Sequence, residues 1–497
     1  MKQNFKLNIK HSNTNFHINI KSNYFKNKND IIFFGNPIYK NFDDINFSNV
    51  HNEIKNISGF FLILFKNQKQ TFLINDCLGN FRCYYIKKGK KVYISDKFEQ
   101  IIKYSKKKLN IEEYNIWKEK NYTLGDSTLF CDIKKIPPGS ILKLNDNLKS
   151  KSYLTYLNDK MIKYKDHCKI VRNSLDESIK NKIDKKIILL FSGGIDSTAL
   201  AKILQKNKAN FEIVYLATFP NTFESEKGLK LAKIIAKLLK KKLIIIKVKW
   251  SLKDNYFAKI INLMMNDFHT SFVQFGGIKK IIQRFGKNIC IMSGQSADSI
   301  FCYGASSNSN SHFIIRFLNI LNIKVLHYVV KKLLEIKYKI NLTLPQNDAE
   351  RKLTFLFSFF YYPFRKSKLN IDKYLTKKVN LFCKHNENKN IQYMKLKIFG
   401  FLQGPDNQVL INAAKICNFY DIYLPFSNFK IISSTCLNQS KVKSLFCPKY
   451  EVKQFLGKKL INLINNFKYN NKKLIKIDNL QSKIKEKFIK KIYEIKK

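Results

Sequence analysis

The sequence lacks several features that would place it in a common class of protein. Its ten cysteines form no Cys-x-x-Cys pair and no His/Cys spacing of the kind that binds zinc. No nucleic-acid-binding module is recognisable, and the N-terminal residues contain no apolar signal-peptide region. The longest strongly apolar stretches, 59–65 and 353–364, are too short or too polar at their edges to span a bilayer. We therefore expect a cytoplasmic enzyme with reduced thiols and no membrane span.

Acidic residues are scarce. The chain has 36 Asp and Glu against 91 Lys and Arg, which gives a formal net charge of +55. The lysines are spread along the whole chain among Asn and Ile, and no compact Arg-rich stripe stands out. This dispersal favours a solvated, lysine-coated surface, which could also attract an acidic or phosphorylated partner, over a specific nucleic-acid partner. With 497 residues, 45% of them hydrophobic, the chain should form two or more domains with real cores.

Glycine is also infrequent, yet two of the 17 glycines adjoin in the most informative segment. An apolar run at 186–191 predicts a buried parallel strand, which breaks at Ser192-Gly193-Gly194 before a helix that opens with Asp196-Ser197-Thr198. Glycines let the backbone approach a polyphosphate, and the N–H groups of a helix start attract anions. Asp196 supplies a hard oxygen ligand suited to Mg²⁺. The alternative is an ordinary strand–turn–helix corner, and the Walker motif is excluded because its second glycine and Lys-Ser/Thr pair are missing. The segment resembles the SGGxDS loop of the ATP pyrophosphatases.

The pattern of elements changes along the chain. Alternation at 5–20 predicts a β-hairpin, and the first 155 residues are β-rich with few helices. After residue 157, helices and strands alternate, which indicates βαβ units and a parallel sheet with ligands at the carboxyl ends of its strands. The predicted order is helix 163–180, strand 186–191, helix 197–206, strand 211–218, helix 224–239, strand 242–248, helix 272–285 and strand 288–292. Beyond about residue 310 the chain should be mostly helical.

A second loop follows the predicted strand 288–292. Small residues, among them Ser293 and Gly294, are followed by Asp298 and a helix. Aspartates at adjacent carboxyl strand ends can share the Mg²⁺ of ATP, whereas Asp298 alone would equally suit a helix N-cap.

Both loops, in this order and at this distance, resemble the synthetase domain of the asparagine synthetase family. Weaker matches to that family follow in order along the chain, at 57–61, 74–79, 92–95, 133–142, 423–426 and 449–453. The resemblance implies an α/β protein with two domains. Residues 1–155 would form an αββα sandwich like the N-terminal-nucleophile hydrolases, and residues 156–497 a parallel sheet like that of the adenine-nucleotide α-hydrolases, with helical additions.

The departures from the family narrow the expected reaction. Glutamine-hydrolysing members need a cysteine directly after the initiator Met, where this chain has Lys2, and the arginine of the family's RDxxG stretch is Asn75. The thiol nucleophile is absent, so we expect no glutaminase activity. Gln295 stands where asparagine-forming members have a glutamate and cannot act as a general base, and Ser299 replaces another glutamate. These losses resemble the β-lactam synthetases and the lasso-peptide macrolactam cyclases, in which an amine of the same molecule attacks an adenylated carboxylate.

The resemblance also implies roles for individual residues, with ATP and Mg²⁺ as cofactors. Asp196 and Asp298 would hold the metal, and Lys449 would stabilise the charge that develops during the reaction. For Lys449 the alternative is one surface lysine among many. The expected nucleotide-binding residues are Phe191, Ser192, Gly193, Gly194, Asp196, Ser197, Ala217, Ser293 and Gly294.

Three functions remain open at this point. The first is an intramolecular amide synthetase acting on a small molecule or peptide that has a carboxylate and an amine, with a precursor peptide and a protease as partners. The second is an asparagine synthetase or sugar amidotransferase that uses ammonia. The third is a non-catalytic paralogue that serves as a binding subunit, against which the retention of both loop aspartates argues.

Overall fold

The computed structural model describes most of the chain between residues 4 and 496. The residues it leaves undescribed are 13, 27–30, 40, 46–49, 67–69, 157–161, 181–183, 220–222, 250–271, nearly all of 302–370, 384–387, 438–448 and 468–474. Lys2 and the apolar stretch 353–364 therefore lie outside the described residues.

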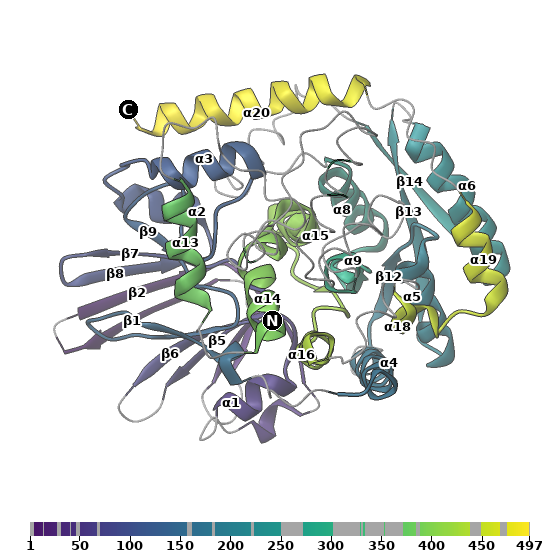
Figure 1. Cartoon of the computed structure of the whole chain (residues 1–497), viewed down its shortest axis with the longest axis horizontal. Coiled ribbons are helices and arrows are strands. Elements are labelled where there is room, and N and C mark those ends of the chain that lie inside the picture. The colour runs from purple at the N-terminus through teal and green to yellow at the C-terminus, as the bar shows by residue number, and fades with distance from the viewer. Residues whose placement is uncertain are drawn as a thin grey trace.

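Two sheets are built from the first part of the chain (Figure 1). The five-stranded sheet has the order β1-β2-β8-β7-β9, and the six-stranded sheet the order β11-β10-β6-β5-β4-β3. The expected hairpin is confirmed by the pairing of β1 with β2, from Phe5 opposite Ile20 to His11 opposite Thr14. The strands are β1 (Phe5–His11), β2 (Thr14–Ile20), β3 (Tyr24–Lys26), β4 (Ile32–Ile38), β5 (Ser58–Lys66), β6 (Thr71–Asn75), β7 (Tyr84–Lys88), β8 (Lys91–Ser95), β9 (Ile133–Lys135), β10 (Ser140–Lys143) and β11 (Ser150–Ser152).

These two sheets share one apolar core. Phe16, Ile18 and Ile20, every second residue of β2, are buried together with Leu62 and Leu64 of β5. The intervening residues of β5 enter a second core on the other face of the six-stranded sheet. Because β5 is buried on both faces, its sequence is continuously apolar rather than alternating. Three helices accompany the sheets: α1 (Val50–Glu53), α2 (Phe98–Ile101) and α3 (Ile111–Lys120).

A third sheet is entirely parallel and has the order β14-β13-β12-β15-β16. Its strands and the helices between them confirm the alternation expected from the sequence. From β12 the chain adds β13 and then β14 on one side of the sheet. It then adds β15 and β16 on the other side of β12. The elements are α4 (Tyr164–Lys180), β12 (Lys186–Leu190), α5 (Ile195–Lys206), β13 (Phe211–Phe219), α6 (Phe223–Leu238), β14 (Leu243–Lys249), α8 (Phe272–Phe285), β15 (Ile289–Met292), α9 (Ala297–Phe301) and β16 (Ile422–Tyr423).

Both faces of this sheet are covered, as a parallel sheet requires. Ile187 and Leu189 pack with α5, α6 and α4 on one face. Ile188, between them, packs on the other face in the core that also holds α8 and α15. Beyond β15 the described elements are almost all helical, as expected: α13 (Ile371–Phe382), α14 (Lys389–Phe399), α15 (Pro405–Ile416), α16 (Phe429–Leu437), α18 (Tyr450–Lys453), α19 (Lys458–Asn466) and α20 (Ile475–Lys496).

Buried polar contacts join the N-terminal sheets to α15 and β16. Asn36 Nδ2 donates to the carbonyl of Ile422 at 2.8 Å. The loop after β6 is folded around Asp76, whose carboxylate accepts backbone N–H groups, including that of Phe81 at 2.8 Å. Asn80, in this loop, accepts from Gln408 Nε2 of α15 at 3.0 Å. The N-terminal sheets therefore hold α15 in place, and α15 matters below because it forms one wall of a cavity.

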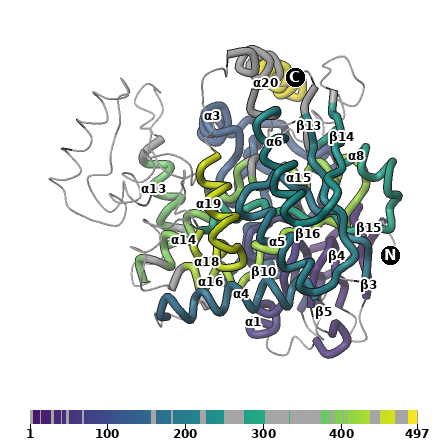
Figure 2. The backbone as a smooth tube through the Cα atoms, turned by 90° about the vertical axis from the view of Figure 1, so that its right-hand side faces the viewer, coloured from purple at the N-terminus to yellow at the C-terminus, as the bar shows by residue number. Residues whose placement is uncertain are grey.

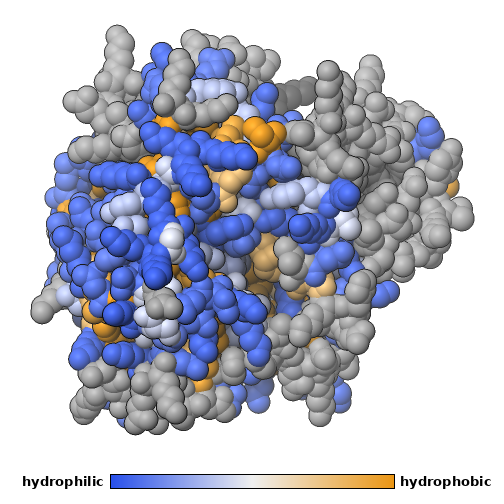
Figure 3. Space-filling model, turned by 90° about the vertical axis from the view of Figure 1, so that its left-hand side faces the viewer, coloured by the Kyte–Doolittle hydropathy of each residue, from blue (hydrophilic) through white to orange (hydrophobic). Residues whose placement is uncertain are grey.

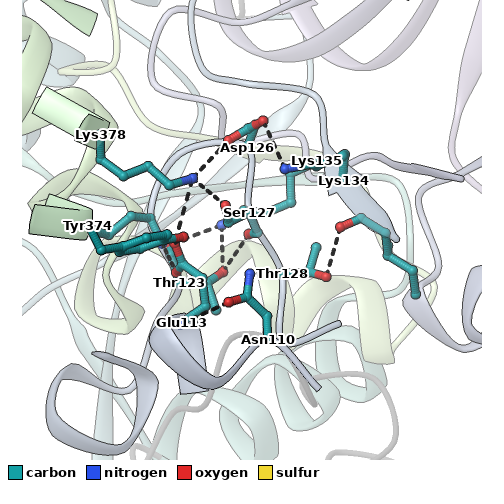
Figure 4. Close-up of polar contacts among 12 residues, drawn as sticks. Asn110, Glu113, Thr123, Asp126, Ser127, Thr128, Lys134, Lys135, Tyr374 and Lys378 are labelled. Carbon is teal, nitrogen blue, oxygen red and sulfur yellow. Dashed lines mark hydrogen bonds and ion pairs between the residues drawn. The ribbon is translucent and has the colours of Figure 1, made fainter. Parts of the chain in front are cut away.

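A second buried polar cluster joins α3 to α13 (Figure 4). Tyr374 donates a 2.6 Å hydrogen bond to Glu113, and Lys378 lies 3.7 Å from Glu113 and 3.2 Å from Asp126. Glu113 is fully buried, so its charge is compensated inside the protein. This cluster fixes a late helix on an early one.

The C-terminal helix α20 lies along the top of the molecule, above α3 (Figure 1), and Figure 2 shows the same edge after a quarter turn. Its sequence is lysine-rich, yet Phe488 and Ile492 are fully buried in the same core as Trp117 of α3. Tyr493 lies edge-on to Tyr114, with ring centroids 6.3 Å apart. The helix is thus part of the folded core on one side and charged on the other.

The surface shown in Figure 3 is largely hydrophilic, as expected from lysines that are spread along the whole sequence. Hydrophilic residues cover most of its coloured surface, with apolar side chains in small scattered groups. None of the helices in the described ranges is both long enough and apolar enough to cross a bilayer. The described cysteines are free thiols, most of them buried.

Candidate active site

The first loop lies where the strand order of the parallel sheet reverses. β12 is central, with β13 on one side and β15 on the other, so the loops after β12 and β15 flank the reversal point. Open α/β sheets bind their ligands in the crevice at this position. The expectation that the two aspartate-bearing loops follow adjacent strands is therefore confirmed.

Gly193 has a conformation and surroundings that require glycine. Its φ is +74°, and a Cβ there would lie 2.8 Å from Cα and 2.9 Å from N of Ala232 on α6. Gly194 is the extended N-cap of α5 and gives the helix no side-chain cap. The first N–H groups of α5 are therefore directed at the loop, as in an anion-binding helix start.

Hydroxyl groups order the same loop. Ser192 Oγ accepts from the N–H of Gly194 at 3.2 Å and lies 3.2 Å from Ser197 Oγ. Ser197 Oγ in turn donates to the carbonyl of Gly194 at 3.3 Å. The predicted phosphate-binding residues thus form one compact turn at the carboxyl end of β12.

The second loop touches the first. A Cβ on Gly294 would lie 2.8 Å from Cβ of Asp196, so glycine allows the two loops to meet. Ser293 N–H donates to the carbonyl of Tyr423 on β16 at 3.1 Å, and Ser299 donates to Asn407 of α15 at 2.9 Å. The replacement of a glutamate by Ser299 thus gives a structural hydrogen bond.

Lys449 connects the aspartates of both loops. Its Nζ lies 2.5 Å from Asp196 Oδ2 and 2.6 Å from Asp298 Oδ1. The Lys449 side chain is only 3% exposed, that of Asp196 is 16% exposed and that of Asp298 is 57% exposed. Lys449 is therefore no ordinary surface lysine: its ammonium is buried between two carboxylates, one inside the site and one at its entrance.

Burial raises the pKa of Asp196 to about 6, against the opposing effect of the Lys449 ammonium and with a contribution from the Asp298 carboxylate. Asp196 Oδ1 is buried and accepts no hydrogen bond from any residue in the described ranges. Asp196 Oδ1 is therefore suited to bind a cation in addition to the Lys449 ammonium, which pairs with Oδ2.

The residues fit a magnesium ion. Mg²⁺ is typically held by one or two carboxylates together with phosphate oxygens and water, rather than by an all-protein cage. Asp196 and Asp298 supply two such carboxylates. Among the described residues, no group of three or more His, Cys, Asp and Glu side chains forms a complete metal cage. Asp196 and Asp298 would thus hold a metal that arrives with phosphate.

A cavity of about 390 Å³ opens beside these loops. This volume falls in the range of small-ligand pockets. Ser192, Asp196, Ser197 and Ser293 supply polar groups to its lining, and the strands and α15 supply apolar side chains. The remaining lining residues are Leu190, Phe191, Val214, Tyr215, Leu216, Gly294, Gln295, Val409 and Leu410. A polar end beside two loops and an apolar wall match a phosphate chain attached to a flat ring.

The cavity also shows what the sequence did not reveal. Ala217, expected at the nucleotide, is buried in β13 next to the lining residue Leu216 and does not itself line the cavity. Gly193, Gly194 and Asp298 shape the loops without lining it. Val409 and Leu410 were missed, since they sit on α15 in a segment that carries no motif.

Asn75 has a structural role in the N-terminal part. Its side-chain Nδ2 donates to the carbonyls of Ile136 and Pro137 at 3.0 and 3.3 Å. Its backbone carbonyl accepts from the Tyr153 hydroxyl at 2.8 Å. The side chain that replaces the family's arginine therefore ties β6 to the turn before β10.

Comparison with known proteins agrees with this geometry. Residues 170–389, which include both loops, match the family model described as Asparagine synthase. The chain contains an asparagine synthase domain. It is also 26% identical over 166 residues to the Microcin J25-processing protein McjC of Escherichia coli, a match that covers 32% of this chain and 31% of that protein. The matched region thus spans about a third of that relative.

Solved structures also align with parts of the chain. NMN synthetase from Francisella tularensis has 14% identity and a TM-score of 0.21, and covers 49% of this chain and 95% of its own. The U34-tRNA thiolase NcsA from Methanococcus maripaludis has 16% identity and a TM-score of 0.21, and covers 48% and 79%. Lys449 lies outside the matched segment of the family model, so its place in the site rests on geometry.

Proposed function

We propose that this protein uses ATP to join a carboxylate to an amine of the same substrate, as in macrolactam or β-lactam closure. The observation that carries this proposal is the Lys449 ammonium, buried between the two loop aspartates beside a cavity at the reversal point of the sheet. The name of the microcin-processing relative supports a peptide as the substrate. The free thiols of the described cysteines are consistent with a cytoplasmic location.

The proposed first step is adenylation. A carboxylate oxygen of the substrate attacks the α-phosphorus of ATP, the bond to the bridging oxygen of the β-phosphate breaks, and pyrophosphate leaves. Ser192, Ser197 and the first N–H groups of α5 would hold the phosphates, with Phe191, Ser293 and Gly294 around the nucleotide. Bound Mg²⁺, held by Asp196 and Asp298, would supply the positive charge that offsets pyrophosphate.

In the second step the amine nitrogen attacks the adenylated carbonyl carbon, the bond to AMP breaks, and the amine gives up a proton. Lys449 would stabilise the negative charge on the phosphate and on the tetrahedral oxyanion, as a fixed cation at the point where charge develops. Gln295 lines the cavity but cannot take the proton, so the base is another group or water.

We propose that residues 1–155 form an inactive αββα sandwich of the N-terminal-nucleophile hydrolase type. Two packed sheets and Asn75 in a structural role support this proposal. Glutamine should then release no glutamate in the presence of the protein. The ammonia-using alternative places the same chemistry at the same site with free ammonia as the amine.

The test uses the full chain with Mg·ATP and two probes: a synthetic peptide that has a free α-amino group and an acidic side chain, or aspartate with ammonium chloride. Release of AMP and pyrophosphate is expected, and ADP with phosphate would contradict the proposal. Cyclised peptide identifies the intramolecular reaction, whereas asparagine identifies the ammonia-using alternative. Mg·ATP binding without turnover on either probe would favour the non-catalytic alternative.

Substitution at the site gives a sharper result. Lys449→Met should lower kcat by about 100-fold or more with little change in Mg·ATP affinity, because its contact is made chiefly in the transition state. Asp196→Ala should lose both Mg·ATP binding and turnover. Asp176→Ala is the control and should keep both, because it removes a carboxylate of similar exposure that pairs with Lys206 away from the site.

A further inference from the structure

Lys449 is presented by a segment that has little stability of its own. α18 is a single turn, Tyr450–Lys453, and Lys449 is its N-cap in the left-handed conformation, with φ of 58° and no side-chain cap. One helical turn is too short to persist without tertiary contacts. A residue other than glycine in this conformation also needs its surroundings to hold it there. The contacts of α18 with the rest of the protein must therefore fix the Lys449 ammonium.

α18 packs on α4 and α5, and the polar contacts that follow Lys449 reach α4. Glu451 is 2% exposed, and its Oε1 lies 3.4 Å from Nε2 of His167 on α4. Just beyond α18, Gln454 Nε2 donates to the carbonyl of Cys168, also on α4, at 3.0 Å. Val452 is fully buried in the core shared with α4 and α5. The side of α18 that carries Glu451 is thus attached to α4.

His167 is itself fixed from the opposite side. Its ring is fully buried, and Nδ1 lies 3.0 Å from Ser434 Oγ of α16. The single hydroxyl proton of Ser434 goes to the carbonyl of Ile431 at 3.0 Å. With the hydroxyl proton donated to Ile431, Nδ1 is placed to donate to Ser434, and Nε2 faces the Glu451 carboxylate. Nε2 and Oε1 lie within ion-pair distance of each other, at 3.4 Å.

We infer that His167 and Glu451 are a positioning pair that holds Lys449 between Asp196 and Asp298. His167 anchors to α16 through Nδ1 and to α18 through Nε2, and Glu451 stands two positions after Lys449 on the same turn. In the part of the chain that is described, neither side chain lines the cavity or pairs with a loop aspartate, so the pair acts through Lys449. This inference rests on the proposed function. It assigns a purpose to two buried polar side chains at a place where apolar side chains could otherwise pack.

The first experiment measures the position of Lys449 without any ATP or substrate. The full chain is acetylated with acetic anhydride at one fixed pH, and the rate at each lysine is read by peptide-resolved mass spectrometry. Lys449 should react slowly, like the buried lysines Lys135 and Lys415. In Glu451→Gln and His167→Gln, Lys449 should react about tenfold faster or more, with Lys135 and Lys415 unchanged, because only α18 is released.

Two variants act as controls for this result. Glu113→Gln removes an equally buried carboxylate that is paired with Tyr374 and Lys378, and it should leave the Lys449 rate unchanged. Glu451→Asp keeps the charge on a shorter side chain and should give an intermediate rate. The inference is overturned if Lys449 stays protected in both Gln variants. It is equally overturned if Lys449 becomes reactive only together with Lys135 and Lys415, since protection would then follow global stability.

The second experiment connects the pair to turnover on the peptide or aspartate probe. In the wild-type background, Glu451→Gln should lower kcat about tenfold and leave KM for ATP nearly unchanged. In a Lys449→Met background the same substitution should lower kcat by less than about twofold. Equal losses in both backgrounds would refute action through Lys449. If Lys449→Met itself keeps normal turnover, the proposed function fails, whatever the acetylation rates show. If Lys449→Met loses turnover while Glu451→Gln changes neither the acetylation rate of Lys449 nor turnover, the inference of a positioning pair is wrong and the proposed function stands.

Discussion

At the residue scale, the most unusual group outside the site is the ammonium of Lys415. It lies at the C-terminal end of α15, where Nζ donates to the carbonyl of Arg82 at 3.3 Å and stands 5.0 Å from the Phe81 ring centroid. Burial lowers the pKa of Lys415 to about 8, with smaller effects from charges nearby, first among them Asp96. The folded protein therefore holds this proton less tightly than the unfolded chain does.

Lys415→Met should stabilise the protein at pH 7, by about 1 to 3 kcal/mol in the free energy of unfolding, because the buried charge is removed. Between pH 8 and about 10.5 the unfolded wild type keeps a proton that the folded state has released. The free energy of unfolding of the wild type should therefore rise with pH over this range. The difference in stability between Lys415→Met and the wild type should shrink accordingly. Urea unfolding at pH 7, 8.5 and 10 measures this, with the exposed Lys459→Met as control. An advantage that grows with pH would contradict the assigned direction.

At the element scale, the turn between β12 and α5 depends on close contact with α6. Two glycines of the chain allow the conformational and the steric costs to be separated. Gly193 and Gly89 both have positive φ, +74° and +54°, but only Gly193 has backbone atoms where a Cβ would lie. Gly89, in the turn between β7 and β8, has no atom within 4 Å of that position.

Gly89→Ala should cost only the conformational strain, about 1 kcal/mol, and leave Mg·ATP binding intact. Gly193→Ala should cost about 1 to 3 kcal/mol more, because α6 must move, and it should weaken Mg·ATP binding by distorting the phosphate loop. Urea unfolding and calorimetric titration with Mg·ATP provide the two readouts. Equal stability losses in both variants would mean that the contact with α6 is not tight.

At the scale of the whole molecule, late segments complete cores that begin early in the chain. α20 closes over α3, α13 is attached to Glu113, and α15 is held by the loop that follows β6. The parts of the chain should therefore unfold together rather than in sequence order.

Phe488→Ala should lower the free energy of unfolding by about 3 to 5 kcal/mol, since it opens a cavity in a fully buried core. Tyr493→Ala, whose side chain is half exposed, should cost much less. Urea unfolding followed by circular dichroism measures both. Comparable small losses would indicate that α20 rests on the surface without sharing the core.

The sequence by itself determined the local elements and the two loops. Strand 186–190 is a run of apolar residues, and Ser192 to Ser197 form a turn whose glycines and hydroxyls act on their immediate neighbours. Such features depend on a few adjacent residues, so they can be read from the chain directly. The domain boundary at 155 and the roles of the site residues stay predictions.

Only the tertiary structure decided how the site is assembled. The reversal of strand order brings β15 beside β12, and Lys449 reaches Asp196 across 253 residues of sequence. His167, Val409 and Leu410 belong to no motif, and Glu451 lies in the weak match at 449–453, which gave it no role. The apolar pattern of their helices would suit many packing partners. Their positions follow from which faces the folded chain buries together, and this is a property of the whole core rather than of any local run of residues.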